Sequence, residues 1–187
     1  MTETRKRSSA SGVEGRSATR ARTAAETPNL SGTWRLDKER SDAIDPYLKA
    51  MGLCQIAIDG HHQKEAATDT FYTLAQTATT FKQSKVSWSG SSERALDFDR
   101  PSHEGSCQIP KTFTVSVVDG AIVTTTEMSK NRTLRDVRVL DDDGESIRMD
   151  LELKTPKETV TLTRWLVKSE PPKPAAKEED DDEDDED

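Results

Sequence analysis

The stretch ESIRMDLELK, residues 145–154, alternates between apolar and polar side chains. One face of an extended segment would hold Ile147, Met149, Leu151 and Leu153, and the other face would hold the charged residues between them. Successive side chains of a strand point to opposite faces of a sheet. The pattern therefore predicts a strand with one dry and one wet face.

The same period of two extends over most of the chain on both sides of this stretch. Pairs typical of tight turns, such as Asp119-Gly120 and Asp143-Gly144, separate the candidate strands. Residues 99–110 contain two prolines and a glycine, which predict an irregular loop. The candidate strands are 70–77, 79–87, 93–98, 112–118, 121–128, 132–140, 145–154 and 158–167.

The N-terminal part of the domain shows a different order of elements. In residues 30–36, Gly32, Trp34 and Leu36 share one face at period two, which predicts a short strand. A period near 3.6 follows, with Ser41 as the expected N-cap of a helix of about ten residues. Its apolar stripe, and the glycine expected to end it, are Ile44, Tyr47, Leu48, Met51 and Gly52.

Residues 53–67 predict a second, weaker helix, with Leu53, Ile56 and Ala57 on its apolar side. One strand, two helices and a run of antiparallel strands expose sheet edges unless the sheet closes on itself. The sequence thus predicts an all-β, up-and-down antiparallel barrel with a two-helix lid between its first and second strands. A barrel of about ten strands is wide enough to leave an internal cavity.

Charge divides the chain into three parts. Residues 1–28 hold six basic and three acidic side chains, and residues 169–187 hold two basic and eleven acidic ones. Both ends lack the large apolar residues that a packed core requires, which predicts disorder. We therefore expect a basic extension (1–28), a folded domain (29–168) and an acidic tail (169–187). The tail would aid solubility, bind a basic protein partner or fold back on the basic arm.

The sequence favours a protein inside the cell. The N-terminus lacks the apolar core of a secretion signal, and no segment has the length of a transmembrane helix. Cys54 and Cys107 are accordingly expected to be reduced and structural. The cytoplasm is the expected compartment. Residues 4–24, rich in Arg, Ser and Ala, leave import into the nucleus, a mitochondrion or a plastid as alternatives.

Both ends of the domain resemble intracellular fatty-acid-binding proteins of the lipocalin-like (calycin) group. Gly32-Thr33-Trp34-Arg35-Leu36, followed by Tyr47-Leu48-Lys49-Ala50-Met51-Gly52, resembles the N-terminal signature of that family. Thr163-Arg164 resembles its closing Thr-Arg-x-Tyr, with Leu166 in place of the tyrosine. The resemblance implies a ten-stranded barrel with a two-helix lid over a cavity for a fatty acid or another small hydrophobic molecule. It implies no cofactor and no metal.

Two arginines are the first candidates for ligand contact. Arg164 shares strand parity with Leu162 and Leu166, which predicts a guanidinium on the apolar face. It would either clamp a ligand carboxylate or stack on Trp34 and close the base of the barrel. Arg138 shares parity with apolar neighbours and is the second candidate, although the other arginines on its strand suggest an outward position.

Apolar residues complete the predicted site. Gly32 and Trp34 are expected to be structural. The predicted underside of the lid includes Tyr47, Leu48 and Met51. The predicted lining of the cavity is Tyr72, Leu74, Phe81, Phe113, Val115, Met149, Leu151 and Leu166.

Other functional classes find little support in the sequence. The histidines and cysteines match no zinc spacing, and no nucleophile elbow or glycine-rich phosphate loop occurs. The basic arm is short and lacks interleaved aromatics, so nucleic-acid binding is not expected. We predict a non-enzymatic intracellular carrier of a fatty acid or similar ligand. The alternatives are a scaffold that binds proteins through its charged tails and, more remotely, a barrel with an unrecognised enzymatic activity.

Overall fold

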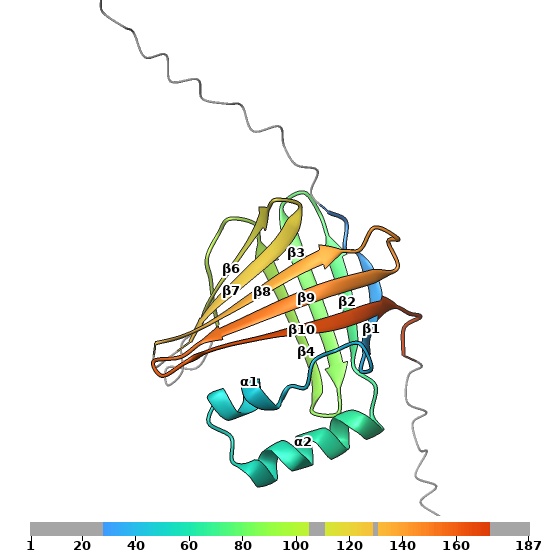
Figure 1. Cartoon of the computed structure of the whole chain (residues 1–187). Helices are drawn as coiled ribbons and strands as arrows, with labels where there is room; N and C mark the ends of the chain where they lie inside the picture. Colours follow the sequence, from blue (N-terminus) through green and yellow to red (C-terminus); the bar gives the residue numbers. More distant parts are fainter. Residues whose placement is uncertain (1–27, 105–110, 129–130, 173–187) are drawn as a thin grey trace, which may run out of the picture.

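The computed structural model describes residues 28–104, 111–128 and 131–172, and shows ten antiparallel strands curved into a barrel (Figure 1). Two helices, α1 (Asp45–Ala50) and α2 (Gln55–Ala67), separate the first two strands and lie across one end of the barrel. The predicted all-β barrel with a two-helix lid is confirmed. Its strands are β1 (Gly32–Asp37), β2 (Phe71–Gln76), β3 (Thr80–Ser87), β4 (Gly90–Asp97), β5 (Ser102–Glu104), β6 (Lys111–Val118), β7 (Ala121–Met128), β8 (Arg132–Leu140), β9 (Ser146–Lys154) and β10 (Thr159–Lys168).

The sheet closes through β1 and β10, which pair with each other, and leaves a seam between β4 and β5. Several contacts bridge the seam. Phe98 forms a single parallel bridge with Val115 of β6. Arg94 of β4 donates from Nε to both carboxylate oxygens of Glu104 of β5, at 3.0 and 3.2 Å. The barrel is therefore nearly closed.

Trp34 anchors the core at the start of β1. Its side chain is 2% exposed, and its indole Nε1 donates a hydrogen bond to the Leu30 carbonyl at 2.9 Å. Gly32 adopts a φ of 142°, a conformation that side chains disfavour. The buried cluster around Trp34 contains Leu30, Leu36, Tyr72, Leu74, Phe81, Leu96, Phe113, Val115, Ile122, Ile147 and Leu166.

The first helix is shorter than predicted, and Ser41 is not its N-cap. α1 begins at Asp45, with Ile44 at the N-cap position and Pro46 in the first turn. Proline has no N–H to donate to the preceding turn, so a regular helix starts at it rather than passing through it. Pro46 therefore sets the start of α1.

Ser41 and Asp42 bind the barrel instead of the helix. The Ser41 hydroxyl donates to the Asp37 carbonyl at 2.5 Å and accepts a bond from the Trp165 N–H at 2.9 Å. The Asp42 carboxylate accepts a bond from the Thr163 N–H at 2.7 Å. These bonds fix the segment between β1 and α1 against the edge of β10.

The second helix is regular, but its buried face differs from the predicted one. Ile58 is 2% exposed, whereas Ile56 is 84% exposed and Leu53 is 39% exposed. Residues two positions apart in a helix lie on nearly opposite sides, so only one of the two isoleucines can face the barrel. The predicted apolar side of Leu53, Ile56 and Ala57 is therefore wrong.

Two strands differ from prediction near the seam. β4 begins at Gly90, three residues before the predicted start, and β5 lies within the predicted loop 99–110. Residues 90–93 are all exposed, so they carry no apolar alternation. β5 has only three residues and pairs with β6. Such segments give no period-two signal in the sequence.

The predicted basic extension (1–28) and acidic tail (169–187) lie almost wholly outside the described residues. We expect a fragment of residues 29–168 to fold alone, because it contains all the strands and both helices of the described residues. Its far-UV circular dichroism per residue should show the same strand signal, and its thermal transition should remain cooperative. A fragment without a cooperative transition would contradict these boundaries. Within the described ranges, no helix has the length and apolar character of a membrane crossing.

Candidate ligand-binding cavity

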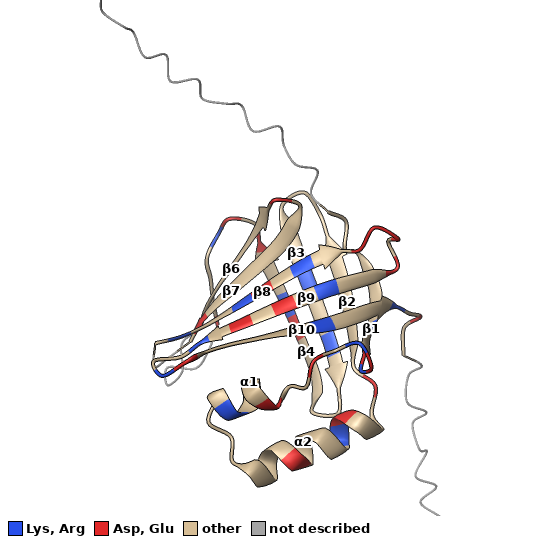
Figure 2. Ribbon diagram, viewed as in Figure 1, with Lys and Arg blue, Asp and Glu red and all other residues tan. Residues whose placement is uncertain are grey.

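A cavity of about 180 Å³ lies inside the barrel. Its wall mixes apolar and polar side chains, because both kinds occur at the inward positions of the strands. The lining comes from β2, β3, β4, β7, β8 and β9: Tyr72, Phe81, Gln83, Lys85, Arg94, Leu96, Thr124, Thr126, Leu134, Asp136, Arg138, Met149 and Leu151. Basic and acidic residues both occur on strands of this wall, such as β8 and β9 (Figure 2).

Arg138 points into the barrel, contrary to the outward position suggested by its neighbouring arginines. It is 3% exposed and forms a close ion pair with Asp136, with Nη2 2.6 Å from Oδ2. Its Nε also donates to both carboxylate oxygens at 3.2 Å. Burial is the largest single influence and lowers the pKa of the guanidinium. The charge of Asp136 and its hydrogen bonds raise the pKa, and the net effect is a raised pKa. Arg138 is therefore charged, and its charge is largely compensated.

One nitrogen of Arg138 has no partner. Its Nη1 is buried and makes no hydrogen bond within the described residues. The guanidinium carbon lies 6.0 Å from the ring centre of Tyr72 and 5.7 Å from that of Phe81. The aromatic rings and Asp136 thus hold the guanidinium in place, and one buried donor is left without a partner within the described residues.

Arg94 is the second arginine of the wall, and it also has a carboxylate partner. Besides its bonds to Glu104, its guanidinium lies 3.8 Å from the ring centre of Phe113. It therefore both bridges the seam and covers the core.

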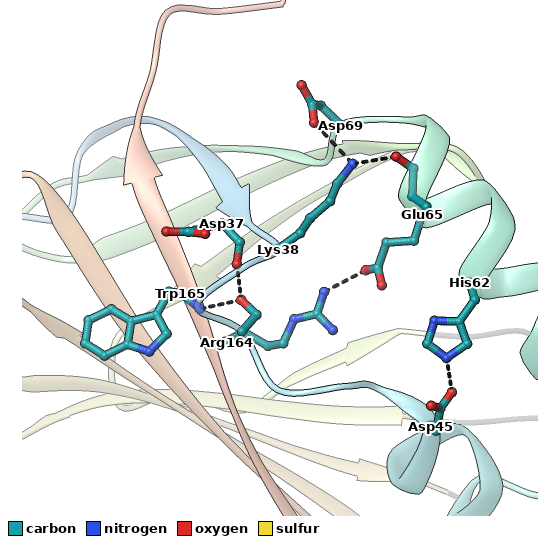
Figure 3. Close-up of polar contacts among 10 residues, drawn as sticks. Asp37, Lys38, Asp45, His62, Glu65, Asp69, Arg164 and Trp165 are labelled. Carbon is teal, nitrogen blue, oxygen red and sulfur yellow. Dashed lines mark hydrogen bonds and ion pairs between the residues drawn. The ribbon is translucent and has the colours of Figure 1, made fainter.

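Arg164, the leading candidate from the sequence, lies in a different place (Figure 3). It is buried, and its Nη2 is 2.6 Å from Oε1 of Glu65 on α2. It lines a separate pocket beneath the lid rather than the barrel cavity. Trp34 pairs with Lys168, four residues farther along β10, so Arg164 does not stack on Trp34. The expected stacking on Trp34 is therefore wrong, and Glu65 is the partner that holds the guanidinium.

Three further contacts hold the lid: one joins its two helices, and two join the lid to residues outside it. His62 of α2 bonds Asp45 of α1 (Figure 3). Lys38 donates to the Ala66 carbonyl at 3.2 Å. Arg132 of β8 donates to the Met51 carbonyl at 3.3 Å.

The turn between β3 and β4 carries Trp88, which meets α2. The His61 ring packs edge-on to the indole, with ring centres 5.2 Å apart, and the Lys64 Nζ lies 4.9 Å from its centre. Burial lowers the pKa of the His61 imidazole. Glu65 raises it, and the nearby charges of Lys85 and Arg164 lower it further. This end of the barrel is therefore rich in charge.

The predicted lid residues do not line the cavity. Leu48 is 8% exposed and Tyr47 and Met51 are half-buried, and none of the three belongs to the lining. Burial raises the pKa of the Tyr47 hydroxyl, and the Asp136 carboxylate raises it further. Tyr47 therefore lies close enough to the cavity wall to feel the charge of Asp136.

The predicted lining residues divide into two groups. Tyr72, Phe81, Met149 and Leu151 line the cavity, together with Arg138. The others belong to the solid core and not to the cavity wall: Leu74, Phe113, Val115 and Leu166.

Sequence reasoning missed most of the polar lining. Gln83 and Lys85 share strand parity with Phe81, and Asp136 shares it with Arg138. The same alternation that predicts an inward Arg138 therefore also predicts inward positions for Gln83, Lys85 and Asp136. Charged side chains on strands usually face solvent, and this general preference argued against those positions.

The remaining candidate groups give no second site. Cys54 is exposed and free, so it is not the structural thiol that the sequence predicted, and Cys107 lies outside the described residues. Within the described part of the chain, no three His, Cys, Asp or Glu side chains gather as metal ligands would.

Several solved structures share this architecture. The REP1-NXSQ fatty acid transporter is 16% identical, with a TM-score of 0.59 over 76% of this chain and 98% of that chain. Fatty-acid-binding protein 1 of Echinococcus granulosus is 14% identical, with a TM-score of 0.60 over 75% and 98%. A secretory abundant heat soluble protein of Ramazzottius varieornatus is also 14% identical, with a TM-score of 0.60 over 76% and 96%.

No family model matches the chain, and no curated protein matches it by sequence. At such low identities the likeness establishes the fold, which is that of the fatty-acid-binding proteins. The ligand must be argued from the cavity, because one fold serves many functions.

Proposed function

We propose that this protein is an intracellular, non-enzymatic carrier of a small hydrophobic molecule held inside the barrel. The observation that carries the proposal is the internal cavity, whose wall combines aromatic and aliphatic side chains with polar and charged ones. A concave site with apolar walls and polar groups that can fix an orientation is the usual place for a small molecule. Tyr72, Phe81 and Leu151 would contact the apolar body of the ligand.

The size of the cavity limits the ligand. At about 180 Å³ it is smaller than the roughly 300–1,000 Å³ that is usual for ligand pockets. A compact or medium-chain molecule fits such a volume better than a long-chain fatty acid does. The cavity also favours a carrier over a scaffold that acts only through its tails, since a scaffold needs no internal space.

The test is whether filling the cavity abolishes binding. Thr124 lines the cavity, and its neighbour Thr125 on the same strand points outward. We expect the neutral fluorescent probe N-phenyl-1-naphthylamine to bind the wild-type protein. Thr124→Trp should weaken this binding at least about tenfold, because the indole would occupy the space of the probe, as core overpacking does.

Thr125→Trp is the matched control and should bind the probe as the wild type does. Fluorescence titration gives both affinities, and thermal melts show whether each variant is folded. Absence of probe binding to the wild-type protein, or equal binding by both tryptophan variants, would contradict the proposed cavity site.

A further inference from the structure

The cavity wall contains three cationic side chains, and two of them are already paired. Arg138 is bound by Asp136, and Arg94 is bound by Glu104. Lys85 is the third. Within the described ranges, its ammonium makes no ion pair within 4.0 Å and no hydrogen bond. Arg164, outside this cavity, is likewise paired, with Glu65.

The two arginines expected to clamp an anion are therefore poor anion sites. Nη1 of Arg138 is buried, so a ligand carboxylate would have to displace Asp136 from three hydrogen bonds to this arginine. At Arg164 it would have to displace Glu65 and break one of the contacts that hold α2. In either case the ion pair of a buried arginine would be broken, which is costly.

Lys85 needs no such displacement. It lies on the inner face of β3, at the same parity as Phe81 and Gln83, and pairs in register with Tyr72. Its Nζ lies 5.7 Å from the ring centre of Tyr72. The residue is half-buried, so its charge is only partly solvated and is less screened than that of an exposed lysine.

The position of Lys85 also defines an orientation. It lies in β3, three residues before Trp88. Trp88 is in the turn after β3 and packs against His61 and Lys64 of α2. Phe81, at the start of β3, lies toward the far end of the strand and belongs to the core cluster. A ligand held by Lys85 would therefore place its polar end near the lid and its apolar end toward the core.

We propose that Lys85 is the residue that binds the anionic group of an amphiphilic ligand, near the lid. This inference rests on the proposed function. It assigns the anion to a lysine of β3, while Arg138 and Arg164 serve the structure through their own carboxylates. A carboxylate on a medium-length apolar chain has the required chemistry.

The experiment compares decanoate with 1-decanol, which share a chain length and differ in charge at pH 7.5. Each displaces N-phenyl-1-naphthylamine from the full-length protein. Lys85→Met keeps an apolar stem and removes the ammonium. We expect it to weaken decanoate binding about tenfold, as for loss of a hydrogen bond to a charged group, and to change 1-decanol binding by less than about twofold.

Two variants serve as controls. Lys82→Met removes the same charge from the exposed outer face of β3 and should change neither affinity. Lys85→Arg keeps the positive charge and should retain decanoate binding within about threefold, which guards against a folding defect of Lys85→Met.

The outcomes separate this inference from the proposed function. If 1-decanol and decanoate displace the probe but Lys85→Met weakens both equally or neither, Lys85 does not bind the anionic group and the inference is wrong. An equal loss of decanoate binding in Lys82→Met would also overturn it, because net charge would then be the cause. If neither compound displaces the probe from the wild type, the proposed function itself fails.

Discussion

Replacing Trp34 with alanine is expected to lower the free energy of unfolding by about 3–5 kcal/mol. The indole is 2% exposed, so its removal leaves a cavity in the cluster that β1 shares with its neighbours. The substitution also removes the donor to the Leu30 carbonyl, and Leu30 is itself fully buried. An unpaired buried carbonyl adds its own cost. Urea denaturation followed by far-UV circular dichroism measures the loss.

Trp165→Ala is the matched control. Trp165 lies on the outer face of β10, where it is half-buried and stacks with Arg40, whose guanidinium is 3.9 Å from the ring centre. An outer cation–π contact contributes about 0.5–1 kcal/mol. We therefore expect this variant to lose less than half as much stability as Trp34→Ala. Equal losses, or a loss below about 1 kcal/mol for Trp34→Ala, would show that the core is not built on Trp34.

The strand part of the fold was predictable because alternation is a local signal. Residues 145–154 show which side chains face inward without any knowledge of the partner strands, and β9 has the predicted register of apolar side chains. Ser41 shows the limit of this reasoning. Its helix-capping chemistry is genuine, but its actual partner is Trp165, more than a hundred residues away. Local sequence does not contain that contact.

For the candidate site, too, the sequence predicted which side chains face inward but not which partners they meet. Parity indicated that Arg164 belongs to the interior, but its partner Glu65 lies on α2, 99 residues earlier. The helix pattern around Glu65 was ambiguous because Ile56 and Ile58 compete for the buried face. Lys85 and Asp136 illustrate the opposite case. Their parity was visible, and only the preference of charged residues for solvent argued against an inward position.

The ion pair between Glu65 and Arg164 fastens the lid to the barrel, and Glu65→Gln is expected to destabilise the protein by about 3–5 kcal/mol. The side chain of Arg164 is 6% exposed and that of Glu65 is 17% exposed. Removing the carboxylate therefore leaves a buried guanidinium without a counter-charge.

Arg164→Met should cost less, because the Glu65 carboxylate can turn toward solvent when its partner is absent. The double variant Glu65→Gln/Arg164→Met should be more stable than Glu65→Gln alone, since an apolar side chain replaces the uncompensated charge. Glu145→Gln breaks an exposed ion pair, in which the side chain of Glu145 is 63% exposed and that of Lys168 is 53% exposed. This variant should lose less than about 1 kcal/mol of stability. Urea denaturation of the four variants tests this order. If Glu65→Gln were no more damaging than Glu145→Gln, the contact between α2 and β10 would add nothing to stability, and the lid would have to be held by its other contacts alone.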